Sequence, residues 1–239
     1  MSKSNVPITK QNIHFSACHI NPTSLCKHID FCRFKFANLQ YDLIAVTETW
    51  FKPLFTDNMA KINGYNLVRN DRIGRRAGEV ALFIKHHYNF KTLAFSNNSA
   101  HDFFAEYLIG ELELNLGNKI FVAVVYRPPN TPFHKGTNFL SVISELSQDY
   151  SSKIILGDFN SNMLTVNSES AVMLEFISSN NFLLVNHGVT HVKNNSVTFG
   201  SLCSRRERKN YQFLQIKWHI LLSSFSYICH IRIICSLCY

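Results

Sequence analysis

The sequence is short of glycine and of charged residues. Nine glycines occur in 239 residues, and Asp, Glu, Lys and Arg together make up 17% of the chain. So little glycine excludes a collagen-like chain, and so little charge beside 46% apolar residues excludes coiled-coil and disordered classes. The length fits one large domain or at most two small ones. Twenty phenylalanines indicate a sheet-rich, well-filled core.

Acidic residues are fewer than basic ones. Lysine and arginine number 24, against 16 aspartates and glutamates, which gives a formal net charge of +8. An excess of this size favours polyanionic partners, although it does not indicate a fold. The first twelve residues are polar and carry no apolar signal-peptide region, so we expect an intracellular protein.

The seven cysteines are odd in number and irregularly spaced, which argues against a disulfide framework. The nearest approach to a metal-binding pair is Cys235 with Cys238, which has His230 upstream. A zinc site is one interpretation, but scattered thiols in a reduced intracellular protein are the favoured one.

The middle of the chain has the periodicities of regular secondary structure. Apolar residues at the spacing of an amphipathic helix run from Leu25 to Leu39, with Thr23 or Ser24 placed to cap it. Further helices are predicted from 137 and over 168–178. Apolar or alternating runs predict strands at 43–46, 80–84, 103–114, 120–125, 153–156 and 182–185. Because these elements mix without strict βαβ alternation, we expect an α/β two-layer or sandwich architecture.

Polar residues follow three of the predicted buried strands. Glu48 follows the first, Tyr126 ends the second, and Asp158 with Asn160 follows the third. Buried strands place their terminal side chains at one rim of a sheet, where ligands usually bind. Taken singly, each has an ordinary explanation, since a Glu after a strand is usually a surface carboxylate and Gly-Asp-Phe-Asn is usually a turn.

Five motifs in order resemble the endonuclease/exonuclease/phosphatase superfamily. Four are His-Ile-Asn-Pro-Thr-Ser-Leu with Asn21, Ala-Val-Thr-Glu-Thr-Trp with Glu48, Val-Val-Tyr-Arg-Pro-Pro with Tyr126, and Gly-Asp-Phe-Asn with Asp158 and Asn160. The fifth, Gly-Tyr-Asn-Leu-Val-Arg-Asn-Asp-Arg at 64–72, resembles the apurinic-endonuclease-like domain of jockey and CR1 non-LTR retrotransposons.

The resemblance covers residues 13–198, which leaves an N-terminal extension at 1–12 and a tail at 199–239. It implies a four-layer α/β sandwich of the DNase I-like kind and hydrolysis of a DNA phosphodiester with a divalent metal, Mg²⁺ or Mn²⁺. It implies no small-molecule cofactor, and a nuclear location for a functional protein.

The resemblance also implies a role for each site residue. Glu48 would be the metal ligand, with Asn21 beside it, because hard cations prefer carboxylate and amide oxygens. Asp158 would orient or deprotonate the attacking water, and Asn160 would hold the phosphate or the water. Tyr126 would donate to a phosphate oxygen as negative charge builds. For Asn21 and Tyr126 alone, a satisfied polar group of the core or a loop is the competing interpretation.

Basic residues gather between predicted elements. Arg69, Arg72, Arg75 and Arg76 form a loop cluster, and Arg127 follows Tyr126. Such a cluster would hold DNA through its phosphates without reading its sequence. The alternative is a solvated surface run with no partner.

The sequence departs from the family's motifs in three places, and these differences lower the activity that we expect. Ala77-Gly78-Glu79 stands where the family usually has three glycines. No aspartate follows Asp158, so the family's terminal Asp strand and its Ser-Asp-His motif are both missing. We therefore expect a sandwich incomplete at its C-terminus and an impaired enzyme. The alternatives are a non-catalytic nucleic-acid-binding remnant and a phosphatase-type relative.

The tail at 199–239 is unlike the rest of the chain. It is rich in Lys and Arg at first, and from Trp218 to Ile231 it is uncharged and largely apolar, short of the roughly 20 residues of a membrane span. We favour out-of-frame or intron-derived sequence from a decayed or mispredicted copy of the element, ahead of a weak membrane anchor with a basic juxtamembrane run. A substitute for the missing strands is the least favoured interpretation.

Overall fold

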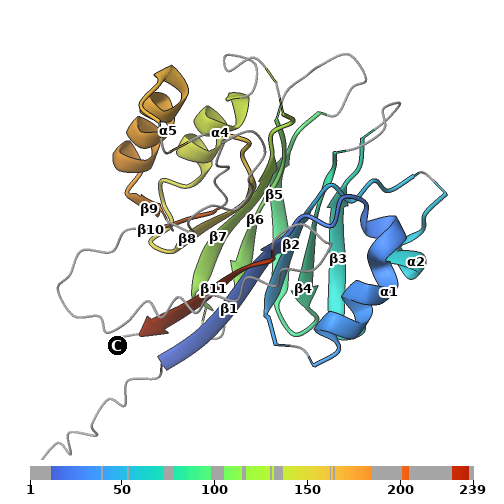
Figure 1. Ribbon diagram of the computed structural model, residues 1–239. Helices are drawn as coiled ribbons and strands as arrows, with labels where there is room; N and C mark the ends of the chain where they lie inside the picture. Colours follow the sequence, from blue (N-terminus) through green and yellow to red (C-terminus); the bar gives the residue numbers. More distant parts are fainter. Residues whose placement is uncertain are drawn as a thin grey trace, which may run out of the picture.

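The computed structural model describes residues 12–38, 40–52, 54–72, 78–97, 105–114, 117–129, 131, 137–161, 163, 165–184, 201–204 and 228–236. Two mixed β-sheets lie face to face, and helices cover the outer face of each (Figure 1). The α/β sandwich expected from the sequence is therefore confirmed.

The first sheet has the strand order β11-β1-β2-β4-β3. Its strands are β1 (Asn12–Ile20), β2 (Leu43–Thr47), β3 (Tyr65–Asn70), β4 (Val80–Lys85) and β11 (Ile228–Ser236). Only β1 and β2 are parallel, and the helix α1 (Leu25–Phe36) connects them. The outer face of this sheet carries α1 and the short α2 (Asp57–Ala60).

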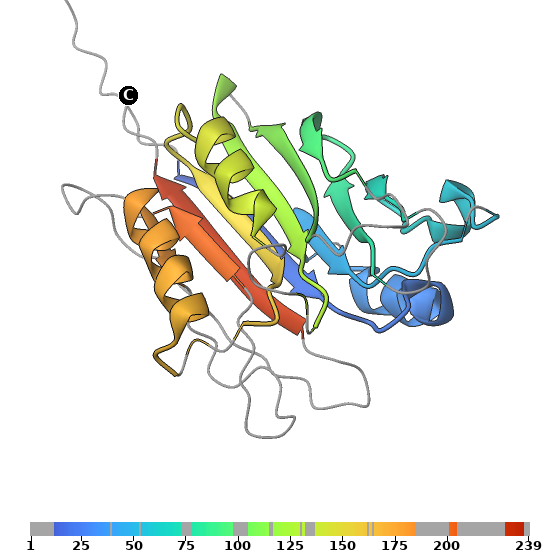
Figure 2. The ribbon, with the colours of Figure 1, turned by 90° about the horizontal axis from the view of Figure 1, so that it is seen from above.

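The second sheet has the order β5-β6-β7-β8-β10-β9. Its strands are β5 (Asn89–Phe95), β6 (Glu106–Glu113), β7 (Lys119–Tyr126), β8 (Lys153–Asp158), β9 (Phe182–Leu184) and β10 (Ser201–Ser204). Strands β7 and β8 are parallel and are joined through α4 (Asn138–Leu146). Figure 2 shows α4 beside α5 (Ser168–Ser179) over the outer face of this sheet.

Three apolar clusters account for the four layers. One lies between the sheets, one between the first sheet and α1 with α2, and one between the second sheet and α4 with α5. Strand β2 shows why its sequence is continuously apolar: Leu43 and Ala45 face the other sheet, while Ile44 and Val46 face the helices. A strand covered on both faces has no side for polar residues.

Two segments of the tail at 199–239 form strands. Ser201–Ser204 inserts between β8 and β9, and Ile228–Ser236 pairs with all nine residues of β1. Four isoleucines in β11 suit a strand, and the edge of β1 offers it unpaired backbone groups. The interpretations of the tail and the boundary at 198 stay predictions. In the described part of the chain, no helix has the length and apolarity needed to cross a membrane.

Candidate active site

The predicted site residues come from the ends of two pairs of parallel strands. Asn21 follows β1 and Glu48 follows β2, while Tyr126 ends β7 and Asp158 ends β8. Parallel neighbours end at the same edge of their sheet, and Tyr126 and Asp158 are register partners. The Nδ2 atom of Asn21 donates to Glu48 Oε1 at 2.8 Å and to Asp158 Oδ2 at 3.2 Å. The structure therefore joins Asn21, Glu48 and Asp158 across the two sheets.

Glu48 sits in a tight turn with a special backbone. Its φ is 57° and that of Trp50 is 53°, which is the left-handed region that side chains disfavour. The backbone of Glu48 is fixed on both sides, because its N–H donates to the Glu79 carbonyl at 2.9 Å and its carbonyl accepts from Ser24 N–H at 3.0 Å. Ser24 is the N-cap of α1, but its side chain makes no capping bond. Its main role here is to hold the turn.

Asp158 is an acid with a strongly perturbed environment. The pKa of Asp158 is raised to about 6, mainly by desolvation, and the nearby negative charge of Glu48 acts in the same direction. Bonds from the Asn160 N–H at 3.2 Å and from the Asn21 amide lower it in part. A carboxylate with a pKa near the working pH is suited to take up a proton in a reaction.

The position before Asp158 requires glycine. A Cβ atom at Gly157 would lie 1.9 Å from the carbonyl oxygen of Val125 on β7, and Gly157 has φ 153°. Strands β7 and β8 can therefore approach closely at the point where Tyr126 and Asp158 leave them.

Tyr126 lies in the core between the sheets, near the carboxylates of Glu48 and Asp158. Burial raises the pKa of Tyr126, and the carboxylates of Glu48 and Asp158 raise it further. The hydroxyl therefore keeps its proton and stays a donor at neutral pH.

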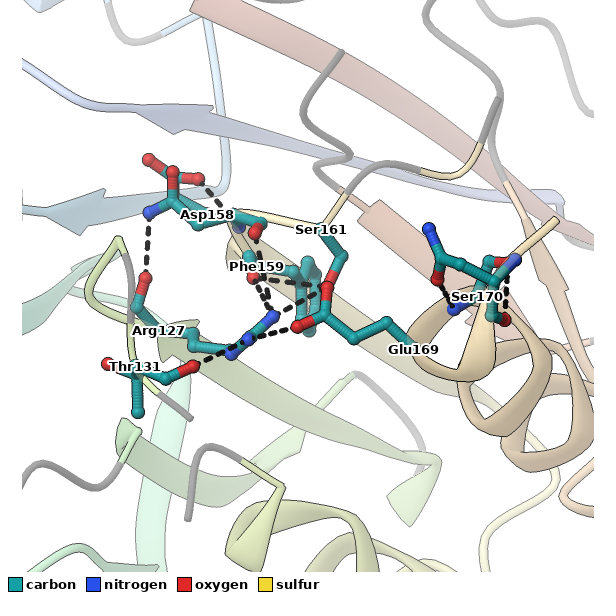
Figure 3. Close-up of polar contacts among 9 residues, drawn as sticks. Arg127, Thr131, Asp158, Phe159, Ser161, Glu169 and Ser170 are labelled. Carbon is teal, nitrogen blue, oxygen red and sulfur yellow. Dashed lines mark hydrogen bonds and ion pairs between the residues drawn. The ribbon is translucent and has the colours of Figure 1, made fainter. Parts of the chain in front are cut away.

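Arg127 and Asn160 fasten the loop that follows Asp158, and Figure 3 shows the Arg127 side chain between Thr131, Ser161 and Glu169. Asn160 Nδ2 donates to the Arg127 carbonyl at 2.7 Å, and the Arg127 N–H donates to the Asp158 carbonyl at 2.8 Å. The guanidinium of Arg127 donates to Ser161 Oγ at 2.9 Å and pairs with Glu169 on α5. Arg127 is 4% exposed, so it lies inside the protein rather than at a surface that DNA could reach.

Two further arginines of the predicted DNA-binding cluster also face acidic groups. Arg69 pairs with Asp71 and, at 3.0 Å, with Asp57, while Arg72 is buried against Glu106. The partners Glu106 and Glu169 are distant in sequence and were not foreseen. Arg75 and Arg76 lie outside the described residues, so their contact with DNA stays a prediction.

Glu79 is a neighbour of the site that motif matching did not assign a role. Thr49 Oγ1 donates to Glu79 Oε2 at 2.9 Å. The pKa of Glu79 is raised to about 7, mainly by desolvation, which outweighs the opposing effect of the bond from Thr49. The only signal in the sequence was a Glu in a position where glycine was expected.

The donor atoms of the site fit a hard divalent cation. Glu48 and Asp158 bring two carboxylates onto one amide, and a cation would neutralise the charge that raises the pKa of Asp158. Among the residues that the structure describes, no three His, Cys, Asp or Glu side chains form a ready-made metal cage. Mg²⁺ is commonly bound through one or two carboxylates while it keeps several waters.

Solved structures with the same fold include an endonuclease domain and a member of the endonuclease/exonuclease/phosphatase family. The human Nocturnin catalytic domain has a TM-score of 0.64 at 14% identity, covering 98% of this chain and 100% of that one. The endonuclease domain of TRAS1, a telomere-specific non-LTR retrotransposon, has a TM-score of 0.57 at 11% identity, and the match covers 80% of this chain and 85% of that one. An endonuclease/exonuclease/phosphatase family protein from Bacteroides thetaiotaomicron has a TM-score of 0.59 at 10% identity, and the match covers 81% of this chain and 84% of that one. No protein-family model and no curated protein matches the sequence.

Identities of 10–14% establish the fold, and the fold is the one that the five motifs implied. The chain has the two-sheet α/β architecture that these nucleases and phosphatase relatives share. Its four strand-end residues, Asn21, Glu48, Tyr126 and Asp158, stand together at one edge of that architecture.

Proposed function

We propose that the chain is a divalent-metal-dependent phosphodiester hydrolase that nicks DNA. The observation that carries the proposal is the Asn21 amide between Glu48 and Asp158, which brings two carboxylates from different sheets to one point. Such a pair can hold a cation and still leave a base for the attacking water.

Each residue then has a chemical task. Glu48 holds Mg²⁺ or Mn²⁺, with Asn21 fixing the carboxylate, and a bound ion would stabilise negative charge on the phosphate. Asp158 accepts the proton of the attacking water, which its raised pKa favours. The Tyr126 hydroxyl donates to a phosphate oxygen as charge develops there. Asn160, fixed on the Arg127 carbonyl, maintains the loop that presents Asp158 and borders the phosphate.

DNA is the proposed substrate for two reasons. The TRAS1 domain, which has the same fold, is the endonuclease of a non-LTR retrotransposon, and the net charge of this chain is +8. We therefore assign the domain at 13–198 to a retrotransposon-type endonuclease that acts in the nucleus. Arg75 and Arg76 are the proposed phosphate contacts, whereas Arg69, Arg72 and Arg127 are given internal roles because acids neutralise them.

Turnover is proposed to be slow. Within these 239 residues no aspartate follows Asp158, so no later aspartate can orient a histidine at the phosphate. The same observation favours a second candidate function, a nucleic-acid-binding protein that does not cut.

Two classes of substrate, phosphodiesters and a phosphomonoester, separate these functions. A phosphodiesterase cleaves supercoiled plasmid or bis(p-nitrophenyl) phosphate with Mg²⁺ and fails with EDTA. A phosphatase-type enzyme instead prefers p-nitrophenyl phosphate, and a binding protein cleaves none of them while it retains plasmid. Preference for the monoester would overturn the proposal.

A further inference from the structure

Glu79 combines two unfavourable features at one residue beside the proposed metal ligand. It is 2% exposed, and its φ is 74°, in the left-handed region that favours glycine. A buried carboxylate must be compensated by hydrogen bonds. A residue with both features is retained in a fold only where the surrounding contacts hold it in place.

The contacts of Glu79 run in two directions. Its N–H donates to the Glu106 carboxylate, which is itself paired with Arg72. Its carbonyl accepts from the N–H of Glu48 at 2.9 Å, and its Oε2 accepts from Thr49 Oγ1 at 2.9 Å. Glu79 therefore connects a buried ion pair at the start of β6 to the turn that presents Glu48.

The backbone that precedes Glu79 is closely packed. A Cβ atom at Gly78 would lie 2.5 Å from Arg72 Nη2 and 2.9 Å from Glu106 Oε2, so the backbone before Glu79 packs directly on the ion pair. The supported side is a turn whose positive φ values at Glu48 and Trp50 are unfavourable by themselves. Thr49, between these two residues, is buried, and its side chain is held by Glu79.

We propose that Glu79 is a positioning residue that sets the metal affinity of Glu48, because its carboxylate holds Thr49 and its carbonyl holds the Glu48 backbone. The inference rests on the proposed function in one respect, namely that Glu48 binds the ion. The essential element is an acceptor at the end of the side chain. A glutamine supplies such an acceptor, whereas glycine suits the backbone and supplies none.

The test measures Mn²⁺ binding to the full chain without DNA, by the loss of the free-ion signal in electron paramagnetic resonance. Glu79→Gly and Thr49→Val are each expected to raise the dissociation constant about fivefold to tenfold, the range that one hydrogen bond gives. Glu79→Gln and Thr49→Ser are expected to stay within about twofold, because each keeps its partner in the bond. The Glu79→Gly/Thr49→Val double variant is expected to match Glu79→Gly, since the contact with Thr49 is already absent there.

Asn181→Gly is the matched control for glycine at a positive φ. Asn181 has φ 56° and is exposed on the turn between α5 and β9, so this change is expected to leave Mn²⁺ binding unaltered. Thermal unfolding of each variant reports whether the fold is kept. If Glu79→Gly does not fold, Thr49→Val and Thr49→Ser still decide the matter.

A folded Glu79→Gly variant, or a Thr49→Val variant, that binds Mn²⁺ with wild-type affinity would overturn the inference. So would a double variant in which the two increases in the dissociation constant multiply. If Glu48→Gln binds Mn²⁺ as tightly as the wild type, Glu48 is not the metal ligand, and the proposed function and this inference are overturned together. The two failures are distinguishable, because the second is already visible without any change at Glu79.

Discussion

The amide nitrogen of Asn21 lies 3.2 Å from the Oδ2 atom of Asp158, although 137 positions separate the two residues in the chain. Asn21 follows a strand of the first sheet, and Asp158 ends a strand of the second. The proposed site is therefore formed by the packing of the two sheets against each other, and it depends on the same core that stabilises the fold.

Replacement of Asn21 by alanine removes the donor shared by two carboxylates. We expect the free energy of unfolding in EDTA to fall by about 1–3 kcal/mol, because two partly buried acceptors lose their partner and the two carboxylates are left facing each other. Mg²⁺ is expected to restore part of the loss by binding the folded state. Urea unfolding with and without Mg²⁺ measures both effects, and a variant that Mg²⁺ does not stabilise would argue against a metal at this point.

The pKa of Asp158 predicts how stability depends on pH in the absence of metal. Its value rises from 3.8 to about 6 in the folded chain, so between these pH values the folded state binds more protons than the unfolded state. The free energy of unfolding contributed by this group is therefore full below about pH 4 and is lost as the pH rises through about 6. Each pKa unit corresponds to about 1.4 kcal/mol, so the loss is of the order of 3 kcal/mol.

Asp158→Asn is the variant that tests this dependence, since an amide does not titrate. Urea unfolding in EDTA from pH 4 to 7 should show a smaller decline for the variant than for the wild type. A decline of part of the original size is expected to remain, because the raised pKa of Glu79 acts in the same direction up to about pH 7. Equal slopes in the two proteins would contradict the assignment.

Arg127→Lys is expected to destabilise the chain without weakening its hold on DNA. A lysine cannot reproduce the bonds of the buried guanidinium to Ser161, Thr131 and Glu169, so we expect a loss of about 2–4 kcal/mol. The dependence of DNA affinity on salt concentration should keep its slope. A slope smaller by about 0.9 would instead show that Arg127 neutralises a phosphate.

Arg76→Gln provides the opposite case. Because Arg76 is a proposed phosphate contact, its replacement should reduce the slope of DNA affinity against salt concentration by about 0.9. The replacement should have little effect on urea unfolding. An unchanged slope would remove Arg76 from the DNA-binding surface.

The parts of the fold that the sequence predicted are those with strong local periodicity. Strands β2, β7 and β8 are covered on both faces, so their continuous apolar runs stand out, and α1 has a clear apolar stripe. Strands β1, β3 and β5 were not predicted. Strand β1 carries the polar His14, Ser16 and His19, and β5 is an edge strand with mostly exposed residues.

Contacts between distant residues limited the prediction of the site. Motif order placed Asn21, Glu48, Tyr126 and Asp158 together, and the structure brings them together. It gave no indication that Arg127 would be neutralised by Glu169 or Arg72 by Glu106, because pairing across 42 or 34 positions leaves no local pattern. The arginines were therefore interpreted as a surface, whereas Arg72 and Arg127 are buried against acids and Arg69 is half-buried between two of them.

The most direct test of the central claim is the nicking of supercoiled plasmid by the purified chain, with Mg²⁺ or with EDTA, next to Asp158→Asn. We predict slow nicking that requires Mg²⁺ and falls about 100-fold or more in the variant, as expected when a general base is lost. Binding of the same plasmid by the variant should be retained. Equal nicking by the two proteins, or none by the wild type under conditions where it binds the plasmid, would contradict the account.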